Sequence, residues 1–161
     1  MNAEAFYHVH KYVIPTALSL LPNQMATPQA RAMLLAIGLQ ESAFMARVQE
    51  NNGPAHGYWQ FEKAGGVRGV LHTSNHFLTS VCRTLNYDMQ EDICYRALIH
   101  NDTLACVFAR LLLWTVPGRL PQQDEPDRGW QQYIQGWRPG KPRPVSWPEY
   151  FTEAWRTVLE E

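Results

Sequence analysis

Apolar residues recur every three or four positions along most of the chain, and almost no stretch alternates apolar and polar residues. Spacing of three or four places side chains on one face of a helix, whereas alternation is typical of a strand. The sequence therefore predicts a mainly α-helical protein. Because it contains no internal repeat and no linker long enough to divide it, we expect residues 1–161 to form a single domain.

Helix-start and helix-end signals give the expected bounds of these helices. Thr27 before Pro28 is typical of a helix start, since the threonine oxygen caps free N–H groups and proline fits the first turn. The run Ser146-Trp147-Pro148-Glu149 matches a capping box. The helix that Asn101 or Asp102 would cap carries a strong apolar stripe, so we expect it at the centre of the core. The predicted helices cover residues 7–21 (which Pro15 can kink), 28–44, 77–85, 93–98, 102–116, 130–134 and 146–158.

The segments between these helices are predicted to be irregular. Asn, Gly and Pro are frequent in residues 51–57, Gly65-Gly66 interrupts the chain again, and the short aromatic segment between them could be extended. Residues 117–129 are polar and are expected to form a surface loop. Residues 137–144 cannot be regular, because their prolines lack backbone donors and fix the dihedral φ.

Charge and composition narrow the classes of function. The chain has 14 Lys+Arg and 15 Asp+Glu, a formal net charge of -1, so it creates no broad positive field for nucleic acid or an anionic membrane. No stretch approaches the roughly 20 apolar residues of a membrane span, and residues 1–6 lack the basic start and apolar run of a secretory signal. We therefore expect no nucleic-acid binding, no stable membrane insertion and no signal peptide.

The cysteines and histidines do not predict a metal or a cofactor. Cys82, Cys94 and Cys106 cannot all pair and form no Cys-x-x-Cys motif, so reduced core thiols are expected, with one disulfide as the alternative. His72 and His76 are spaced by one helical turn and could bind a metal. Because no third ligand has suitable spacing, solvated or capping histidines are the preferred interpretation.

One carboxylate lies on an apolar helix face. Five residues that step by four, three, four and three positions project from that face, namely Ala30, Leu34, Ile37, Glu41 and Phe44. An acid held against apolar neighbours is harder to ionise, so the pKa of Glu41 should rise, as a general acid working near neutral pH requires. The alternative is a partly exposed glutamate at a frayed helix end.

An aromatic turn follows this carboxylate. The run Gly57-Tyr58-Trp59-Gln60-Phe61 could bring an amide and aromatic faces beside the helix end, where a sugar ring needs hydrogen bonds and stacking. The chain as a whole is rich in aromatic residues, with 6 Trp, 7 Tyr and 6 Phe. Core packing is the alternative use of the turn.

These two motifs resemble those of the soluble lytic transglycosylases and goose-type lysozymes of the lysozyme superfamily, and of small phage-encoded members in particular. The family signature is a Glu-Ser pair followed by an aromatic residue, and then a turn of the form Gly-x-x-Gln-hydrophobic. Here those positions read Glu41-Ser42, Phe44 and Gly57-Tyr58-Trp59-Gln60-Phe61. The match covers about residues 38–61, and residues 102–113 resemble the family's later helix more loosely.

The resemblance implies a lysozyme-like helical domain with a short irregular or β-like segment near the cleft. It also implies cleavage of the β-1,4 bond between N-acetylmuramic acid and N-acetylglucosamine in peptidoglycan. Glu41 would be the single catalytic acid, and Ser42 its hydrogen-bonding neighbour. The residues assigned to the glycan cleft are Gly57, Tyr58, Gln60 and Phe61.

The far wall of the cleft departs from the family pattern, which usually has a Tyr-Asn-x-Gly segment there. The nearest run is Trp137-Arg138-Pro139-Gly140, with Tyr133 four residues before Trp137, so Tyr133 and Trp137 are assigned to this wall. The basic residues Arg138, Lys141 and Arg143 could meet a peptidoglycan carboxylate, although such a run is more often a solvated loop.

No second acid lies in a matching motif, so we expect a one-acid mechanism in which the substrate's acetamido group assists. The preferred function is a lytic transglycosylase that forms 1,6-anhydromuramic ends in phage lysis or entry. The alternatives are a hydrolytic lysozyme, a noncatalytic glycan-binding or structural module of the same fold, and an enzyme for chitin-like polymers. Expected partners are peptidoglycan strands and phage virion proteins, and the expected locations are the host cytoplasm before lysis or the virion. No cofactor or metal is expected.

Overall fold

The chain begins with one continuous helical segment that contains a wider turn. In the computed structural model, which describes residues 1–161, α1 (Ala3–His8) and α2 (Ile14–Ser19) are joined by a π-helical turn over Val9–Val13. Pro15 follows this turn. Because proline has no N–H and its ring displaces the carbonyl four residues earlier, it widens the preceding turn. The disturbance expected at Pro15 therefore takes the form of a π-helical turn.

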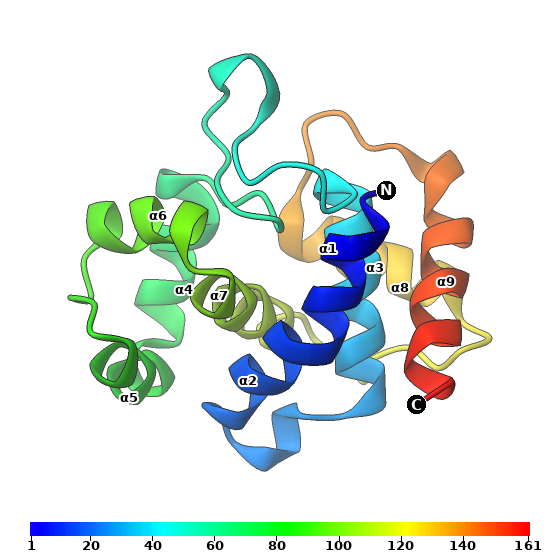
Figure 1. Cartoon of the computed structure of the whole chain (residues 1–161), viewed down its shortest axis with the longest axis horizontal. Helices are drawn as coiled ribbons and strands as arrows, with labels where there is room; N and C mark the ends of the chain where they lie inside the picture. Colours follow the sequence, from blue (N-terminus) through cyan, green and yellow to red (C-terminus); the bar gives the residue numbers. More distant parts are fainter.

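Helices joined by loops make up the rest of the fold, and there is no sheet (Figure 1). The longer helices are α3 (Pro28–Ser42), α4 (Arg68–Thr73), α5 (Asn75–Leu85), α6 (Glu91–His100), α7 (Asp102–Trp114), α8 (Pro126–Trp137) and α9 (Trp147–Leu159). Single turns of 3-10 helix cover Asn23–Met25, Glu50–Asn52 and Pro144–Ser146. The predicted mainly helical class is confirmed.

Helices α3 and α7 form the centre of the fold. Residues 32–40 of α3 are all buried, so this helix is enclosed on every side and not only along one stripe. Residues 104–111 of α7 are buried in the same way. Figure 1 shows α7 between α4, α5 and α6 on one side and α1, α2 and α3 on the other. The expected central position of α7 is correct, but α3 shares it.

Both central helices begin as their sequence signals predict. The Thr27 side chain accepts a hydrogen bond of 3.1 Å from the N–H of Ala30, and Pro28 occupies the first turn of α3. At the start of α7, the Asn101 side chain accepts a hydrogen bond of 2.9 Å from the N–H of Leu104. Asn101, and not its neighbour in the sequence, is therefore the cap.

Two other local predictions are wrong. Gly65-Gly66 does not break the chain, because Lys63–Val67 forms a π-helical turn that continues directly into α4. Ser146 does not cap α9, because its hydroxyl donates a hydrogen bond of 2.9 Å to Oε1 of Gln40 instead. The extended segment is present only as two isolated antiparallel bridges, which pair His56 with Val48 and with Phe61.

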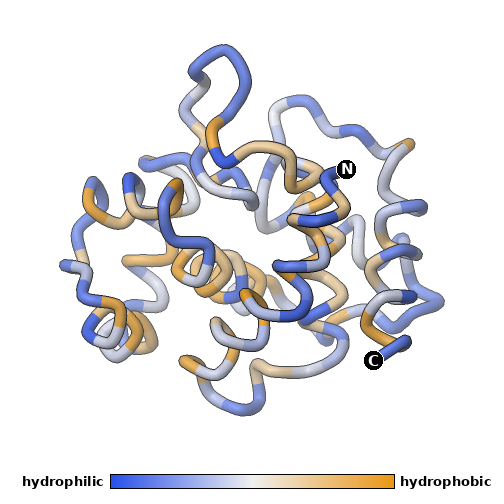
Figure 2. The backbone as a smooth tube through the Cα atoms, in the orientation of Figure 1, coloured by the Kyte–Doolittle hydropathy of each residue, from blue (hydrophilic) through white to orange (hydrophobic).

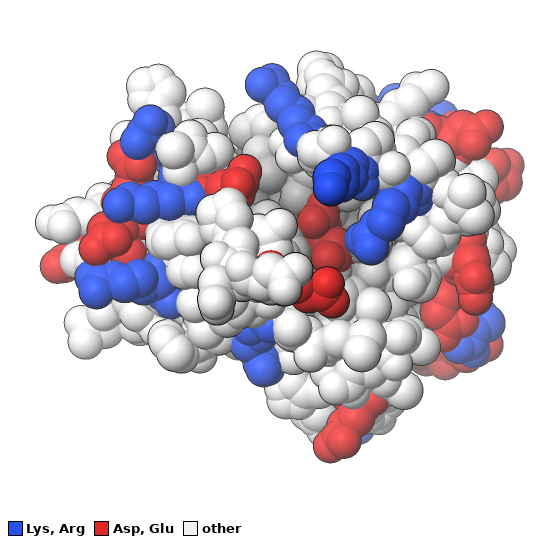
Figure 3. Space-filling view, turned by 90° about the horizontal axis from the view of Figure 1, so that it is seen from above, with Lys and Arg blue, Asp and Glu red and all other residues white.

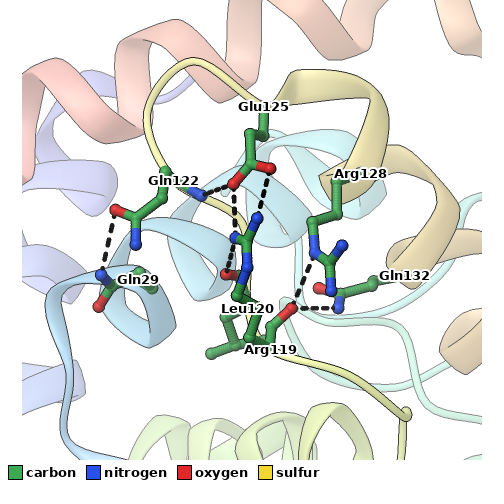
Figure 4. A network of polar contacts seen from close by, with 7 residues as sticks. All are labelled: Gln29, Arg119, Leu120, Gln122, Glu125, Arg128 and Gln132. Carbon is green, nitrogen blue, oxygen red and sulfur yellow. Dashed lines mark hydrogen bonds and ion pairs between the residues drawn. The ribbon is translucent and has the colours of Figure 1, made fainter.

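A polar network holds the loop before α8 (Figure 4). The Arg119 guanidinium donates two hydrogen bonds, of 2.6 and 2.7 Å, to the Glu125 carboxylate. The Arg119 carbonyl accepts one of 3.0 Å from Arg128 and one of 2.8 Å from Gln132. Because this network fixes the loop to the first turns of α8, the helix begins at Pro126 and is longer than predicted.

The core collects the apolar side chains of these elements. Figure 2 shows that hydrophobic positions concentrate on the central helices and hydrophilic ones on the loops. Cys82, Cys94 and Cys106 are all free and buried. None of the helices alone has the length and apolar content to cross a membrane, and only α6 and α7, bent by 120° at their junction, meet that test together.

Candidate active site

Glu41 lies in the last turn of α3, where the helix ends abruptly. Ala43 and Phe44 both adopt the left-handed backbone region, with φ of 51° and 53°, and so reverse the chain. The Phe44 ring then folds back onto Gly38, where a Cβ atom would lie 2.2 Å from the ring. Only glycine leaves room for this contact, which fixes the helix end that carries the acid.

Ser42 stabilises the same helix end. Its hydroxyl donates a hydrogen bond of 3.2 Å to the Gly38 carbonyl and accepts one of 3.1 Å from the N–H of Phe44. The sequence analysis assigned Ser42 as the hydrogen-bonding partner of Glu41. In the structure the Ser42 hydroxyl bonds to backbone groups instead, so its role is to hold the turn after Glu41.

The Glu41 carboxyl is partly buried and is bound by a hydroxyl group. Tyr133 donates a hydrogen bond of 2.5 Å to Oε1 of Glu41. Burial raises the pKa of Glu41 to about 7, while the Tyr133 hydrogen bond and the Arg143 charge oppose this rise. A carboxyl with a pKa in this range keeps a protonated form near neutral pH, where an ordinary glutamate is ionised. The pKa rise expected from the apolar helix face is present.

Tyr133 is itself held rigidly in an aromatic group. Its side chain is only 2% exposed, and its ring stacks on Trp147 with centroids 5.4 Å apart and planes 9° apart. Trp130 and Trp137, one turn before and after it on α8, flank the ring. Burial, with the nearby Glu41 charge, raises the pKa of Tyr133. The hydroxyl consequently stays protonated and remains a hydrogen-bond donor.

The turn over Gly57-Tyr58-Trp59-Gln60-Phe61 is fixed to both α3 and α8. The buried Trp59 ring donates a hydrogen bond of 2.8 Å to the Leu34 carbonyl in α3. The Trp59 carbonyl accepts one of 2.9 Å from the Trp137 ring in α8. The two predicted motifs are therefore adjacent in space, and Trp137 links the turn to the helix that carries Tyr133.

Gly57 and Gln60 set the shape of this turn. Gly57 has φ of 79°, and a Cβ there would lie 3.0 Å from the Leu98 carbonyl oxygen, so glycine is required. Gln60 also has positive φ, of 54°, and its side-chain amide donates a hydrogen bond of 3.0 Å to the Gly57 carbonyl. The Gln60 side-chain amide therefore bonds within the turn and stabilises it. Its side-chain oxygen, Oε1, is left for other partners.

Tyr58 and Phe61, assigned to the glycan cleft from the sequence, are core residues. Tyr58 is 4% exposed, and its ring lies against Phe44 and under the Arg47 guanidinium. Phe61 is 3% exposed and contacts Phe108 and Trp137 edge to face. Both rings therefore pack in the core, as in the core-packing alternative, and of the two only Phe61 also lines a cavity.

A cavity of about 530 Å³ lies beside the turn. Gln60, Phe61 and Trp137 form part of its lining, and Gly65, Gly66, Gly69 and Gly136 leave other parts of the wall without side chains. Glu41 does not line this cavity. Gln60 and Trp137, which were predicted to line the glycan cleft, therefore line a hollow whose lining does not include the acid.

Helix α8 carries a Tyr-x-x-Gly run that was not recognised from the sequence. Tyr133-Ile134-Gln135-Gly136 keeps the tyrosine and glycine of the expected segment, with isoleucine in place of asparagine. A Cβ at Gly136 would lie 3.2 Å from the Val116 side chain, so the glycine permits close packing of α8 against the end of α7. The three-residue spacing between Tyr133 and Gly136 was the signal in the sequence from which this run could have been recognised.

Gln40 is a further residue of this region that was not singled out from the sequence, and it holds Arg143, a member of the predicted basic run. Gln40 is 1% exposed, and its amide donates a hydrogen bond of 2.9 Å to the Arg143 carbonyl. The Arg143 guanidinium donates in turn to the Gln40 carbonyl. The signals in the sequence were the amide residue directly before the predicted acid and the proline-rich basic run that contains Arg143.

The structure contains no group of three or more His, Cys, Asp and Glu side chains that could hold a metal ion. His72 and His76 lie on different helices, α4 and α5, which meet at Ser74, so they are not one helical turn apart as the sequence analysis assumed. No protein-family model, curated protein or solved structure matches the chain.

Proposed function

We propose that the protein cleaves the β-1,4 bond between N-acetylmuramic acid and N-acetylglucosamine in peptidoglycan, as a lytic transglycosylase with Glu41 as its single acid and base. The observation that carries this proposal is a partly buried carboxyl with a pKa of about 7 that accepts a hydrogen bond from Tyr133. A general acid is most effective when its pKa lies near the working pH. The resemblance of the Glu41-Ser42 and Gly57–Phe61 motifs to the family supports the same conclusion.

The first chemical step is proton transfer from Glu41 to the glycosidic oxygen. Because the Tyr133 hydroxyl donates to Oε1, the proton is held on Oε2, and we assign Oε2 as the oxygen that protonates the glycosidic bond. The bond between C1 and the glycosidic oxygen then breaks, and the leaving sugar takes the proton as its 4-hydroxyl. The acetamido oxygen of the muramic residue bonds to C1 and stabilises the developing positive charge.

The second step uses the Glu41 carboxylate as a base. It removes the proton from the C6 hydroxyl of the muramic residue, and this oxygen attacks C1 and displaces the acetamido oxygen, giving a 1,6-anhydro end. If a water molecule takes the place of the C6 hydroxyl, the product is a reducing end, as in a lysozyme. The second outcome is the alternative function.

The absence of a second nearby carboxylate favours this mechanism over a two-acid one. Arg143 is the only charged side chain that changes the pKa of Glu41 appreciably. Two-carboxylate glycosidases hold their acids roughly 5 to 9.5 Å apart, a separation at which each should alter the pKa of the other. Substrate assistance replaces the missing carboxylate. Phage lysis or entry, with virion proteins as partners, is the setting that the resemblance suggests and is part of the same proposal.

Mass spectrometry of digested peptidoglycan tests the proposal. The expected products are anhydro-muropeptides, which are lighter than reducing muropeptides by one water. Glu41→Gln should abolish their release, whereas the matched change Glu149→Gln, at an exposed position in the first turn of α9, should leave it unchanged. Reducing muropeptides would indicate the lysozyme alternative. Binding of glycan strands without any cleavage would indicate the noncatalytic module.

A further inference from the structure

The loop between α8 and α9 carries positive charge without any acidic residue. Residues 138–146 include Arg138, Lys141 and Arg143 and no Asp or Glu. In Figure 1 this loop lies on the same side of the molecule as residues 45–57, and Figure 3, which views that side, shows basic side chains gathered near its middle. The overall charge of -1 makes this a local feature of the candidate active-site face.

Arg143 is the member of this loop that is fixed next to the acid. Its guanidinium donates to the carbonyl of Gln40, the residue immediately before Glu41, and its charge lowers the pKa of Glu41. None of the ion pairs of the protein includes Arg143. A guanidinium has five N–H donors, so most of those on Arg143 have no protein acceptor.

The backbone of Arg143 is held rigidly. Its carbonyl accepts hydrogen bonds from the buried Gln40 amide, at 2.9 Å, and from the Ser146 hydroxyl, at 3.1 Å. The single hydrogen of this Ser146 hydroxyl is shared with Gln40 Oε1, 2.9 Å away. Pro142 and Pro144 on either side restrict the loop further. The arginine is therefore prearranged on the surface before any ligand arrives, which reduces the entropy cost of binding.

We infer that Arg143 is a specificity residue that binds a carboxylate of the glycan substrate beside the cleaved bond. A planar guanidinium with free donors in fork geometry suits a carboxylate, which accepts two parallel hydrogen bonds. This inference rests on the proposed function, because it names the acidic sugar as the preferred substrate over a neutral polymer. The carboxylate is either the lactyl group of muramic acid, free on strands without peptides, or an acid of the peptide stem.

Matched glycan substrates separate these sources. The first is peptide-free strands with free lactyl carboxylates, the second is the same strands with those groups converted to carboxamides, and the third is peptide-bearing strands. Arg143→Gln should raise KM for carboxylate-bearing strands about tenfold and leave KM for carboxamide strands unchanged, because only the former lose a charge-assisted hydrogen bond. If Arg143→Gln raises KM on peptide-free strands, the lactyl group is the bound carboxylate. If it raises KM only on peptide-bearing strands, the bound carboxylate belongs to the peptide stem.

Two control variants distinguish specificity from structure. Lys141→Gln removes one positive charge from the same loop at an exposed residue and should change KM little on any strand. Arg143→Lys keeps the charge but not the fork, and should recover part of the lost affinity. An equal loss on carboxylate and carboxamide strands, or no loss on either, would overturn the inference. If the wild-type protein cleaves none of them, the proposed function fails, and the carboxylate preference is tested separately by calorimetric binding of the same strands.

Discussion

The Tyr133 hydroxyl donates a hydrogen bond of 2.5 Å to Glu41 although the two residues are 92 positions apart in the sequence. The contact joins the end of a central helix to α8, whose position depends on the polar network around Arg119. The ionisation of the acid therefore depends in part on a helix that lies far from it in the chain.

Tyr133→Phe should move the upper pH limit of activity to higher pH. The hydrogen bond stabilises the charged form and lowers the pKa of Glu41, so its removal raises that pKa above about 7. The alkaline side of the activity profile, where Glu41 loses its proton, should shift by about one pH unit, given the usual strength of a hydrogen bond to a charged group. A pH profile of kcat/KM on purified peptidoglycan measures this. An unchanged profile would mean that Glu41 does not act as the acid.

Glu41→Gln should stabilise the protein at high pH. The folded-state pKa of about 7 lies above the unfolded value near 4.5, so the unfolded state releases its proton first and stability falls as the pH rises between these values. Above pH 7 the wild-type carboxylate costs up to about 3 kcal/mol, which glutamine avoids. Urea unfolding should show this difference at pH 8 and none at pH 4. A variant equally stable at both would contradict the raised pKa.

Gly38→Ala should destabilise the helix end that holds the acid. The new methyl group would meet the Phe44 ring at 2.2 Å, so the ring must move, at a cost of about 1–3 kcal/mol. Gly69→Ala is the matched control in α4, because a Cβ there meets nothing within 4 Å. Alanine at position 69 should stabilise by up to about 1 kcal/mol. Thermal unfolding of both variants tests the contrast, and equal effects would refute the packing argument.

Ser146→Asp should destabilise the protein by about 1–3 kcal/mol. Aspartate is as good as serine at a helix start, so the capping-box interpretation would make this change neutral or favourable. In the structure the Ser146 hydroxyl shares its one hydrogen between Gln40 Oε1 and the Arg143 carbonyl, and a carboxylate has no hydrogen to donate. Denaturant unfolding decides between the two interpretations, with Ser146→Ala as the reference for the loss of the donor alone.

The sequence predicted best where a local signal coincided with burial. The caps at Thr27 and Asn101 and the helical spacing from Ala30 to Glu41 depend on neighbouring residues, and each is present in the structure. Phe44 was predicted on the same helix face but lies beyond the helix end, where the chain reverses. Spacing alone could not show that α3 is enclosed on every side, because that depends on which helices pack around it. Nor could it show that Tyr58 lies in the core.

The failures have a common physical cause, which is competition between local and distant partners. Ser146 satisfies the local rule for a cap, but the buried Gln40 amide needs a donor and takes its hydroxyl. Tyr133 was assigned to the far wall, but its contact with Glu41 was not predicted. The pattern around it lacks the expected asparagine, and its hydrogen bond to Glu41 depends on the packing of α8. Long-range pairings of this kind leave little trace in a single sequence.

Gln40 and Glu41 are consecutive residues, and this gives the helix end a second consequence. Gln40 holds the Arg143 loop by its side chain and by its carbonyl, while Glu41 is bound to α8. Any local opening of the last turn of α3 must therefore release both attachments at once. We expect the backbone amides of residues 41–44 and 145–147 to exchange hydrogen for deuterium with a shared protection factor, as one cooperative unit that opens and closes together.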